Sequence, residues 1–544
     1  MRIASCFSSL LLLGMAAAAE PKAKPNVVII VADELGARDL GCTGSTYYKT
    51  PNLDAFAKRG VKLDEAYSNW QDDLILLFTL HSGLTPERFF KSSISDERSL
   101  FGMKPLEKLL SPRHQFKLGN ILTDLLCGPS PPAFAAAKYT NITHAGDAEW
   151  LKKKLKSTTG TPFFATIIIR TVPPNGEALA NYKTGKAGSQ GDPRYAARVE
   201  QLDRQVGEIL KALEDAKVSD NTFIVFTSAG SGNCIDWDTK HATTSNAPYR
   251  DGQGYLYEGG LRVPFLIRGP GVKAGGFPIS AADILPTLVS LCGIETDAKY
   301  DGVDLGAQFL GTAKPDPNRS LHWHCPRYTP QYGRPGGAIR VGNDKLIEYF
   351  EDGRRELFDL GKDVGESKNL AAEKPELVKE LAAKLAAWRK EVGAQMPVPN
   401  PDYKPNPQAE DGSITLHART AFVTGVQLRF EPAPHKNTLG YWTNATDTAS
   451  FDFTVTKPGT FTVHALQGAG KGSGGAEVEL AVGDSNAKFT VKDTGGFQQF
   501  EKRKVGELTI AKAGRHTLTV TPNSKPGVAV MDLREVTLNP KSHK

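Results

Sequence analysis

Two adjacent carboxylates, Asp33 and Glu34, directly follow the apolar run Asn26–Ala32. The run is β-branched and does not alternate with polar residues, which is typical of a strand buried on both faces of a parallel sheet. In an open α/β sheet, polar groups just past the carboxyl end of a strand lie where ligands bind. Two neighbouring acids suit a hard cation such as Ca²⁺ or Mg²⁺, which takes oxygen ligands. A solvated loop that carries two acids is the alternative.

Further apolar runs predict the elements that would position these acids. Residues 162–169 and 222–227 are typical of two more buried strands, and residues 195–214 have apolar side chains at helical spacing. Strands that alternate with helices predict a layered α/β domain with helices on both faces of the sheet. Residues 339–360 predict a β-hairpin instead, because Asp352-Gly353 is a strong hairpin turn signal, and a helix is expected at about 375–392.

The last quarter of the chain has a different pattern. A proline-rich stretch at 396–407 predicts a stiff, extended linker. From about Gly412 onward, short alternating runs separated by glycine-rich turns predict an all-β sandwich. The runs lie at 451–455, 460–463, 478–482 and 517–520. Tyr441, Trp442 and Phe497 could form a sugar-binding platform, although single aromatic side chains in a sandwich more often belong to the core.

Composition bounds the class of protein. The 544 residues are too many for one ordinary domain, and 40% hydrophobic with 23% charged residues is typical of a globular protein. A formal net charge of +6 without a dense Lys/Arg run excludes nucleic acid as the expected partner.

The first residues predict a secretory signal peptide, with Arg2, an apolar run at 10–13 and small residues at 16–19. No later run reaches about 18 apolar residues, so we expect a secreted or periplasmic protein without a membrane anchor. The five cysteines after position 19 have no CxxC spacing, which indicates buried thiols, with at most one disulfide bridge.

Four segments together resemble the sulfatase family of the alkaline phosphatase superfamily. They are PNVVIIVADELG, DLGCTG, KTPNLDAFAKRGVKLDEAYS and YEGGLRVPFLIRGPGV, and with later segments the resemblance extends from Pro25 to Tyr403. It implies a central mixed sheet flanked by helices, then a small antiparallel sheet with one helix. The sandwich resembles carbohydrate-binding modules of secreted polysaccharide-processing enzymes. The expected domains are 1–19 signal peptide, 20–325 sulfatase-like α/β domain, 326–398 C-terminal sulfatase subdomain, 399–411 linker and 412–544 accessory β-sandwich.

The family resemblance also implies where a nucleophile would lie. Sulfatases use formylglycine made from Cys or Ser in a Cys/Ser-x-Pro-x-Arg motif, ten residues before the glycine of a conserved turn. Counting back from Gly83 places Asp73 at the nucleophile position, Ile75 at the proline and Leu77 at the arginine. We therefore expect no formylglycine.

The family's metal site is also incomplete in this sequence. Asp33 and Glu34 match its first pair of acids, but its second pair falls on Ala229 and Gly230. Asp73 would face the same pocket, so we predict at most a weak, vestigial Ca²⁺ site of three carboxylates. Without a cation, one of the three would hold a proton.

The cationic positions of the family are mostly replaced. Gln253 takes the place of the lysine before the EGG motif. The family's Lys-Trp-His segment falls on Gln115 to Lys117, and a further histidine on Pro173. Each lost cationic donor costs about 10²–10³ in rate. Three polar residues, Lys240, His241 and Arg262, stay near the site, with a structural role the more common alternative.

These substitutions predict a secreted sulfatase-family protein that is catalytically degenerate and binds, or scaffolds enzymes on, sulfated or neutral polysaccharide. The alternative is an active hydrolase of sulfuric or phosphoric esters on sulfated glycans, acting through a non-standard metal site.

Overall fold

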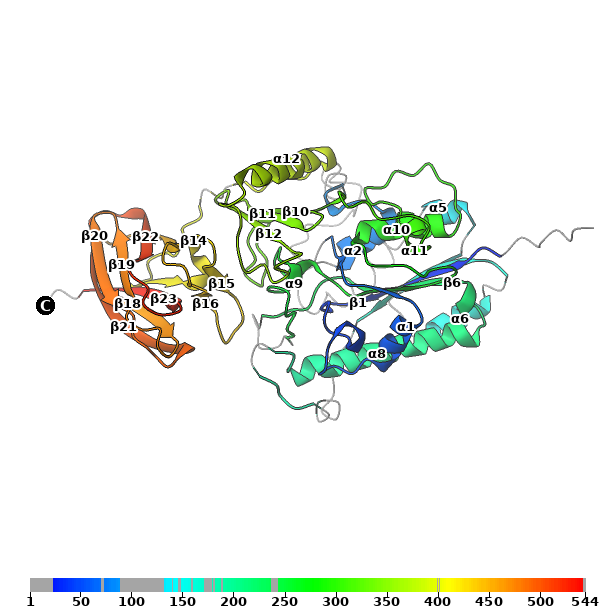
Figure 1. The fold of residues 1–544 in the computed structure, drawn as a ribbon, viewed down its shortest axis with the longest axis horizontal. Helices are drawn as coiled ribbons and strands as arrows, with labels where there is room; N and C mark the ends of the chain where they lie inside the picture. Colours follow the sequence, from blue (N-terminus) through cyan, green and yellow to red (C-terminus); the bar gives the residue numbers. More distant parts are fainter. Residues whose placement is uncertain are drawn as a thin grey trace, which may run out of the picture.

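The computed structural model describes residues 23–541, apart from 70–72, 89–131, 139, 145–147, 158–159, 171–178, 180–181, 187–188, 236–242, 399 and 401. The predicted signal peptide and Cys127 lie outside the described residues. Figure 1 places the six-stranded sheet with its helices at one end of the molecule and the C-terminal strands at the other, with a four-stranded sheet between them. The predicted fold class is confirmed in all three parts.

The central sheet has the strand order β2-β7-β6-β1-β5-β4. Strands β6, β1, β5 and β4 run parallel, whereas β7 is antiparallel to both β6 and β2, so the sheet is mixed as predicted. The bounds are β1 Asn26–Ala32, β2 Val61–Leu63, β4 Thr140–His144, β5 Phe163–Ile169, β6 Thr222–Ser228 and β7 Phe265–Arg268. A two-stranded sheet joins β3 Ala66–Tyr67 to β8 Ile279–Ser280.

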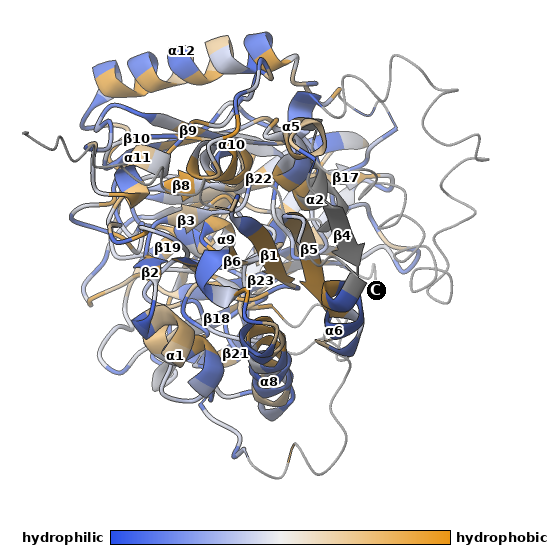
Figure 2. Cartoon of the chain, turned by 90° about the vertical axis from the view of Figure 1, so that its right-hand side faces the viewer, coloured by the Kyte–Doolittle hydropathy of each residue, from blue (hydrophilic) through white to orange (hydrophobic). Residues whose placement is uncertain are grey.

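Every residue of β1 is buried, and alternate side chains enter two different cores. Val28 and Ile30 pack with α1, α6 and α8, while Val27, Ile29 and Val31 pack with α2, α5 and α10. This explains the lack of polar alternation in the sequence, because both faces of the sheet are covered. The helices are α1 Pro51–Lys58, α2 Asp73–Ser82, α5 Pro132–Ala136, α6 Ala148–Ser157, α8 Pro193–Asp215, α9 Glu258–Leu261, α10 Ala281–Leu291 and α11 Gly306–Phe309, with short 3-10 turns at Gly41–Thr43 and Ser219–Asn221. In Figure 2, β1 and β5 are coloured hydrophobic while α8 alternates between the two colours.

The small subdomain is a four-stranded antiparallel sheet of order β12-β11-β10-β9 with helix α12 on one face. Its elements are β9 Ser320–Cys325, β10 Gly336–Val341, β11 Asp344–Tyr349, β12 Arg355–Asp359 and α12 Pro375–Val392. The predicted helix at 375–392 and the hairpin around Asp352-Gly353 are both confirmed. The sheet begins at Ser320, ahead of the boundary predicted at 326, because β9 pairs with β10 over its whole length.

The C-terminal part is a sandwich of two antiparallel sheets around one core. One sheet has the order β15-β16-β23-β18-β21, with β13 paired to β23, and the other has the order β14-β17-β22-β19-β20. The strands are β13 Ile414–His417, β14 Phe422–Thr424, β15 Arg429–Glu431, β16 Thr438–Gly440, β17 Thr448–Val455, β18 Gly459–Ala469, β19 Glu477–Val482, β20 Ser485–Thr490, β21 Gly496–Ile510, β22 Gly514–Pro522 and β23 Asp532–Pro540, with a 3-10 turn at Ala418–Thr420.

The proline-rich linker is hydrogen-bonded to the sandwich. Asn406 donates its side-chain amide to the Asp452 carbonyl, and the Gln408 N–H bonds the Thr454 carbonyl. The second half of the predicted linker therefore lies along β17. Among the described residues, no helix is long and apolar enough to cross a membrane.

Candidate functional site

The carboxyl ends of β1 and β6 lie side by side at one edge of the central sheet, because Ala32 is paired in register with Ser228. The loops that follow are tied together there. Ser228 accepts a 2.9 Å hydrogen bond from the Leu35 N–H through its hydroxyl, and that hydroxyl donates to the Gly230 carbonyl at 2.7 Å. Asp33 and Glu34 begin the first loop, so the structure places them at the predicted ligand-binding edge.

Glu34 and Gln253 meet at this edge, although 219 positions separate them along the chain. The Gln253 side-chain amide donates a 2.8 Å hydrogen bond to Glu34 Oε1, and the Gln253 residue is only 6% exposed. Glu34 has a backbone φ of 49°, which is uncommon for a residue with a side chain and occurs often at functional sites. A neutral amide therefore faces this carboxylate where the family resemblance implies a lysine.

The described donor set at this edge does not fit a hard cation. Ca²⁺ takes six to eight oxygen ligands, whereas the described loops supply the carboxylates of Asp33 and Glu34 beside Ala229 and Gly230, which have no side-chain oxygen. Within the described part of the chain, no three His, Cys, Asp or Glu side chains gather closely enough to hold a metal. Asp73 is the first residue of α2, but its side chain lies outside the description, so the three-carboxylate site stays a prediction.

Most of the remaining predicted positions lie outside the described residues. They are Gln115 to Lys117, Pro173, Lys240 and His241. Arg262 is described, and it has a structural role. Its Nε donates at 2.5 Å to Glu258 and its Nη1 at 2.9 Å to the Asp64 carbonyl. Arg262 therefore joins buried elements rather than facing the sheet edge as a catalytic cation.

A buried group of charges, here called the Lys345 cluster, contains Lys345, Glu258, Glu366, Arg262 and Arg340. Lys345 is 0% exposed, and its ammonium lies 2.9 Å from Glu258 Oε1 and 2.8 Å from Glu366 Oε1. Burial raises the pKa of both carboxyl groups, but the charges of Lys345 and Arg262 bring the pKa of Glu258 below its usual value, while that of Glu366 stays raised. The cluster joins α9 of the α/β domain to the small subdomain, which gives the EGG motif a structural role.

Asp39 is a site-positioning residue to which the sequence analysis gave no role. It is fully buried and accepts hydrogen bonds from Tyr195 Oη at 2.6 Å, Thr244 Oγ1 at 2.7 Å and the Gly36 N–H at 2.8 Å. Burial raises the pKa of this carboxyl group, and the hydrogen bonds partly offset the shift. Asp39 thereby fixes the loop after β1 against α8. Its position in the DLGCTG segment, seven residues after the end of the strand, was the available signal.

The aromatic platform predicted in the sandwich is not formed as one surface. Trp442 is 0% exposed and donates its indole N–H to the Asp447 carbonyl at 2.8 Å, so it belongs to the core. Tyr441 is 45% exposed, but the Arg429 guanidinium covers one face of its ring at 3.7 Å from the centroid. Phe497 is half-buried against Gly468 and Gly470. The core alternative is therefore correct for Trp442.

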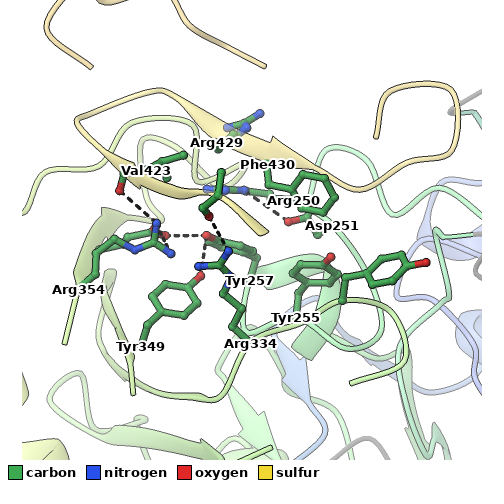
Figure 3. A pocket seen from close by; sticks show the side chains of 13 residues that line it. Arg250, Asp251, Tyr255, Tyr257, Arg334, Tyr349, Arg354, Val423, Arg429 and Phe430 are labelled. Atoms are coloured by element: carbon green, nitrogen blue, oxygen red, sulfur yellow. Dashed lines mark hydrogen bonds and ion pairs between the residues drawn. The ribbon is translucent and has the colours of Figure 1, made fainter. Parts of the chain in front are cut away.

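A cavity of about 50 Å³ lies beside Gln253, where the sandwich meets the rest of the chain. Asp251 and Tyr255, two positions to either side of Gln253, line it together with Arg250, Arg354 and Arg429 (Figure 3). No motif pointed to this cavity, because its arginines come from three segments that are remote in sequence.

Comparison with known proteins identifies separate stretches of the chain. The sulfatase family model matches residues 130–294, and the model for the C-terminal part of N-sulphoglucosamine sulphohydrolase matches 251–391. A domain of unknown function (DUF5077) matches 417–543, which covers most of the sandwich.

Characterised relatives match over most of their own length. A sulfatase of Formosa agariphila is 24% identical over 499 residues, covering 67% of this chain and 88% of that protein. Human arylsulfatase A is 26% identical, covering 68% and 89%, and the N-acetylgalactosamine-6-O-sulfatase of Bacteroides thetaiotaomicron is 24% identical, covering 66% and 92%.

Solved structures share the fold. Ps i-CgsB in complex with k-i-k-neocarrahexaose superposes with a TM-score of 0.52 at 23% identity, covering 69% of this chain and 94% of that one. A Bacteroides thetaiotaomicron protein (BT33336S-sulf) superposes with a TM-score of 0.52 at 20% identity, covering 68% and 99%.

Proposed function

We propose, from the premise that this chain belongs to the sulfatase family, that it is a secreted protein that binds sulfated polysaccharide and does not hydrolyse sulfate esters. Its α/β domain would act as a binding or scaffolding surface, and its sandwich would contribute to holding the glycan.

The pairing of Gln253 with Glu34 carries this proposal. A sulfatase needs cations around the sulfate, because preorganised positive groups stabilise the charge that develops in the transition state. At the family's lysine position, this chain has an amide whose N–H is engaged by a carboxylate at 2.8 Å. With Asp73 at the nucleophile position, no aldehyde hydrate can form there.

The glycan part of the proposal rests on relatives and on the appended domain. One relative is an N-acetylgalactosamine-6-O-sulfatase, which is an enzyme of sulfated sugars, and one matching model is the C-terminal part of an N-sulphoglucosamine sulphohydrolase. Secretion is proposed from the sequence at residues 1–19. A weak, vestigial Ca²⁺ site is proposed from the sequence alone, and it depends on Asp73 adding a third carboxylate to Asp33 and Glu34, which do not fit a hard cation by themselves.

Hydrolysis of an aryl sulfate ester in the presence of Ca²⁺ tests the loss of chemistry. We expect no turnover by the natural protein, because neither nucleophile nor cationic donors are in place. An Asp73→Cys/Ile75→Pro/Leu77→Arg variant, which restores the Cys-x-Pro-x-Arg motif and is co-expressed with a formylglycine-generating enzyme, should also be inactive, because Gln253 and Gly230 are unchanged. Turnover by the natural protein that disappears in an Asp33→Ala variant would contradict the proposal and support an active ester hydrolase with a non-standard metal site.

A further inference from the structure

The sandwich is docked on the rest of the chain along a surface here called the seam, formed by residues 250–257 and 332–369 on one side and 419–431 on the other. Arginines from the sulfatase part reach across it. Arg334 donates to the Ala421 carbonyl at 2.5 Å and to the Arg419 carbonyl at 3.2 Å, and Arg354 donates to the Val423 carbonyl at 3.3 Å. Both parts of the chain therefore build any cavity that lies in the seam.

The seam cavity is rich in arginine and tyrosine (Figure 3). Arg250, Arg334 and Arg354 from the sulfatase part and Arg429 from the sandwich line it, and the acids in its wall are Asp251 and Glu356. Its volume of about 50 Å³ compares with the roughly 10–15 Å³ that one water molecule needs on the same measure. The cavity therefore has room for a group of several heavy atoms.

Three guanidinium groups around this cavity have a buried N–H without an acceptor in the described part of the chain. They are Nε of Arg250, Nε of Arg354 and Nη1 of Arg429. Buried donors are almost always hydrogen-bonded in folded proteins, and a charged donor left without a partner is especially costly. The side chain of Arg250 is only 9% exposed, so bulk water does not readily satisfy it.

The acids of the seam do not supply the missing acceptors. The Asp251 carboxylate forms an ion pair with Arg250, but its 3.6 Å distance from Nε is too long for a hydrogen bond (Figure 3). Glu356 accepts from Tyr257 Oη at 2.7 Å and is 3.8 Å from Arg354. A further acid, Glu431, accepts from Arg429 Nε at 2.9 Å and from Lys436, which leaves Nη1 of Arg429 unused.

Ring stacking orients two of these arginines. The guanidinium carbon of Arg250 lies 3.6 Å from the Tyr257 ring centroid, and that of Arg354 lies 4.4 Å from the Tyr349 centroid. Stacking occupies the face of a guanidinium and leaves the N–H groups at its edge available to an oxyanion. The two side chains are thus held in place before any ligand arrives.

Two larger cavities adjoin the seam cavity. One of about 240 Å³ shares Tyr332 and Arg334 with it, and one of about 520 Å³ shares Arg250, Arg354 and Arg429. Because each of them shares lining residues with the arginine cavity, an extended chain of sugars bound in either one can place a charged group at the arginines.

We propose that the seam cavity binds a sulfate ester of a polysaccharide chain that lies along the seam, held by Arg250, Arg354 and Arg429. Three donors from three separate side chains match an oxyanion with three free oxygens better than a carboxylate with two. The proposal rests on the proposed function for the identity of the ligand, and it places the binding site between two domains rather than at the sheet edge.

Titration calorimetry with the full mature chain tests the proposal, using a sulfated galactosamine-containing oligosaccharide and its desulfated form. We expect Arg429→Gln and Arg354→Gln each to weaken binding of the sulfated form about tenfold or more, because each removes a charge-assisted hydrogen bond. Arg503→Gln is the matched control, because Arg503 lies on β21, at the opposite edge from β15 in the same sheet, and should change affinity less than twofold.

The outcomes separate this inference from the proposed function. If the natural protein binds the sulfated oligosaccharide and the seam variants bind it equally well, the seam is not the binding site. The polysaccharide then binds elsewhere on the protein. If the seam variants lose affinity for the desulfated form to the same extent as for the sulfated form, the oxyanion bound in the seam cavity is a carboxylate. If the natural protein binds neither form, the proposed function fails as well.

A second measurement does not depend on the oligosaccharide or on how the variants fold. Crystals of the natural protein soaked in selenate, a sulfate analogue with a strong anomalous signal, should show a peak between the three guanidinium groups. Selenate peaks at other positions only would overturn the anion site. A peak at the seam in a protein that binds no glycan would preserve the anion site and overturn the proposed function.

Discussion

Two clusters of charged side chains join the parts of this chain, and they differ in how completely their donor groups are hydrogen-bonded. In the Lys345 cluster, the ammonium of Lys345 lies within 3 Å of two carboxylates, and Arg262 is bonded to Glu258. In the seam, three arginines retain an N–H without an acceptor among the described residues. We infer that the Lys345 cluster, in which no buried donor lacks a partner among the described residues, holds the domains together, whereas the seam, with spare donors, is prepared for a ligand. The following predictions test that contrast.

The largest effect is expected from breaking the complete cluster. Lys345→Met should lower the free energy of unfolding by about 3–5 kcal/mol, because it leaves Glu366 buried without its cation and Glu258 with Arg262 alone. Chemical denaturation measures the change. The matched control is Lys384→Met, which removes an exposed i,i+4 pair with Glu380 and should cost less than about 0.5 kcal/mol. Equal stability of the two variants would mean that the cluster does not hold the subdomain.

Acid should destabilise the protein through His81, for which the described part of the chain provides no charged partner. Burial lowers the pKa of His81 to about 4, and its ring bonds Thr166 Oγ1 at 2.8 Å. Because the unfolded chain takes up this proton near pH 6.5 and the folded chain does not, stability is lost as the pH falls below about 6.5. From pH 7 to pH 5 the loss from His81 should be about 2 kcal/mol.

Measuring the free energy of unfolding at pH 7 and at pH 5 checks this loss of stability, with the His81→Gln variant as the comparison. Glutamine keeps a hydrogen-bonding side chain but does not titrate, so the variant should lose about 2 kcal/mol less stability on acidification. An equal loss in both proteins would show that His81 takes up its proton normally in the folded state.

The smallest effect is expected in the seam, where Asp251 competes with a bound anion. Burial raises the pKa of Asp251 to about 6, and Arg250 opposes the shift. The charged and titratable groups that act on it are Arg250, Cys234, Tyr255, Arg429, Glu431 and Lys436. Protonation removes a negative charge beside the site, so affinity for the sulfated oligosaccharide should rise about three- to tenfold as the pH falls through 6.

An Asp251→Asn variant separates this carboxyl group from its neighbours. It should bind at pH 7 as tightly as the natural protein binds at pH 5, with a flat pH profile between them. A variant that keeps the full pH dependence would assign the titration to another group.

The sequence predicted the parts of the fold that local patterns determine. The apolar run of β1 indicates burial on both faces, and the helix of residues 375–392 begins at Pro375 and is followed by Gly393 with a positive φ. The start of the small sheet was placed too late, because the pairing of β9 with β10 joins residues that no local pattern connects.

The candidate site was only partly predictable, because it too depends on contacts between residues that no local pattern connects. Glu34 and Gln253 could be paired through the family resemblance, which supplies long-range positions that a single sequence does not. The Lys345 cluster and the seam depend largely on contacts between residues about 70 to 180 positions apart, and arginines and tyrosines in ordinary loops carry no motif. Trp442 was open to two interpretations because alternation shows which residues share a face but not which face is covered.

The most direct test of the account mixes the natural protein with a sulfated oligosaccharide and Ca²⁺, and follows binding and release of inorganic sulfate in the same sample. The account predicts a saturable complex from which no sulfate is released, because the family's nucleophile and lysine positions hold Asp73 and Gln253. Catalytic release of sulfate, abolished by Asp33→Ala, would contradict it and establish the chain as an active sulfatase.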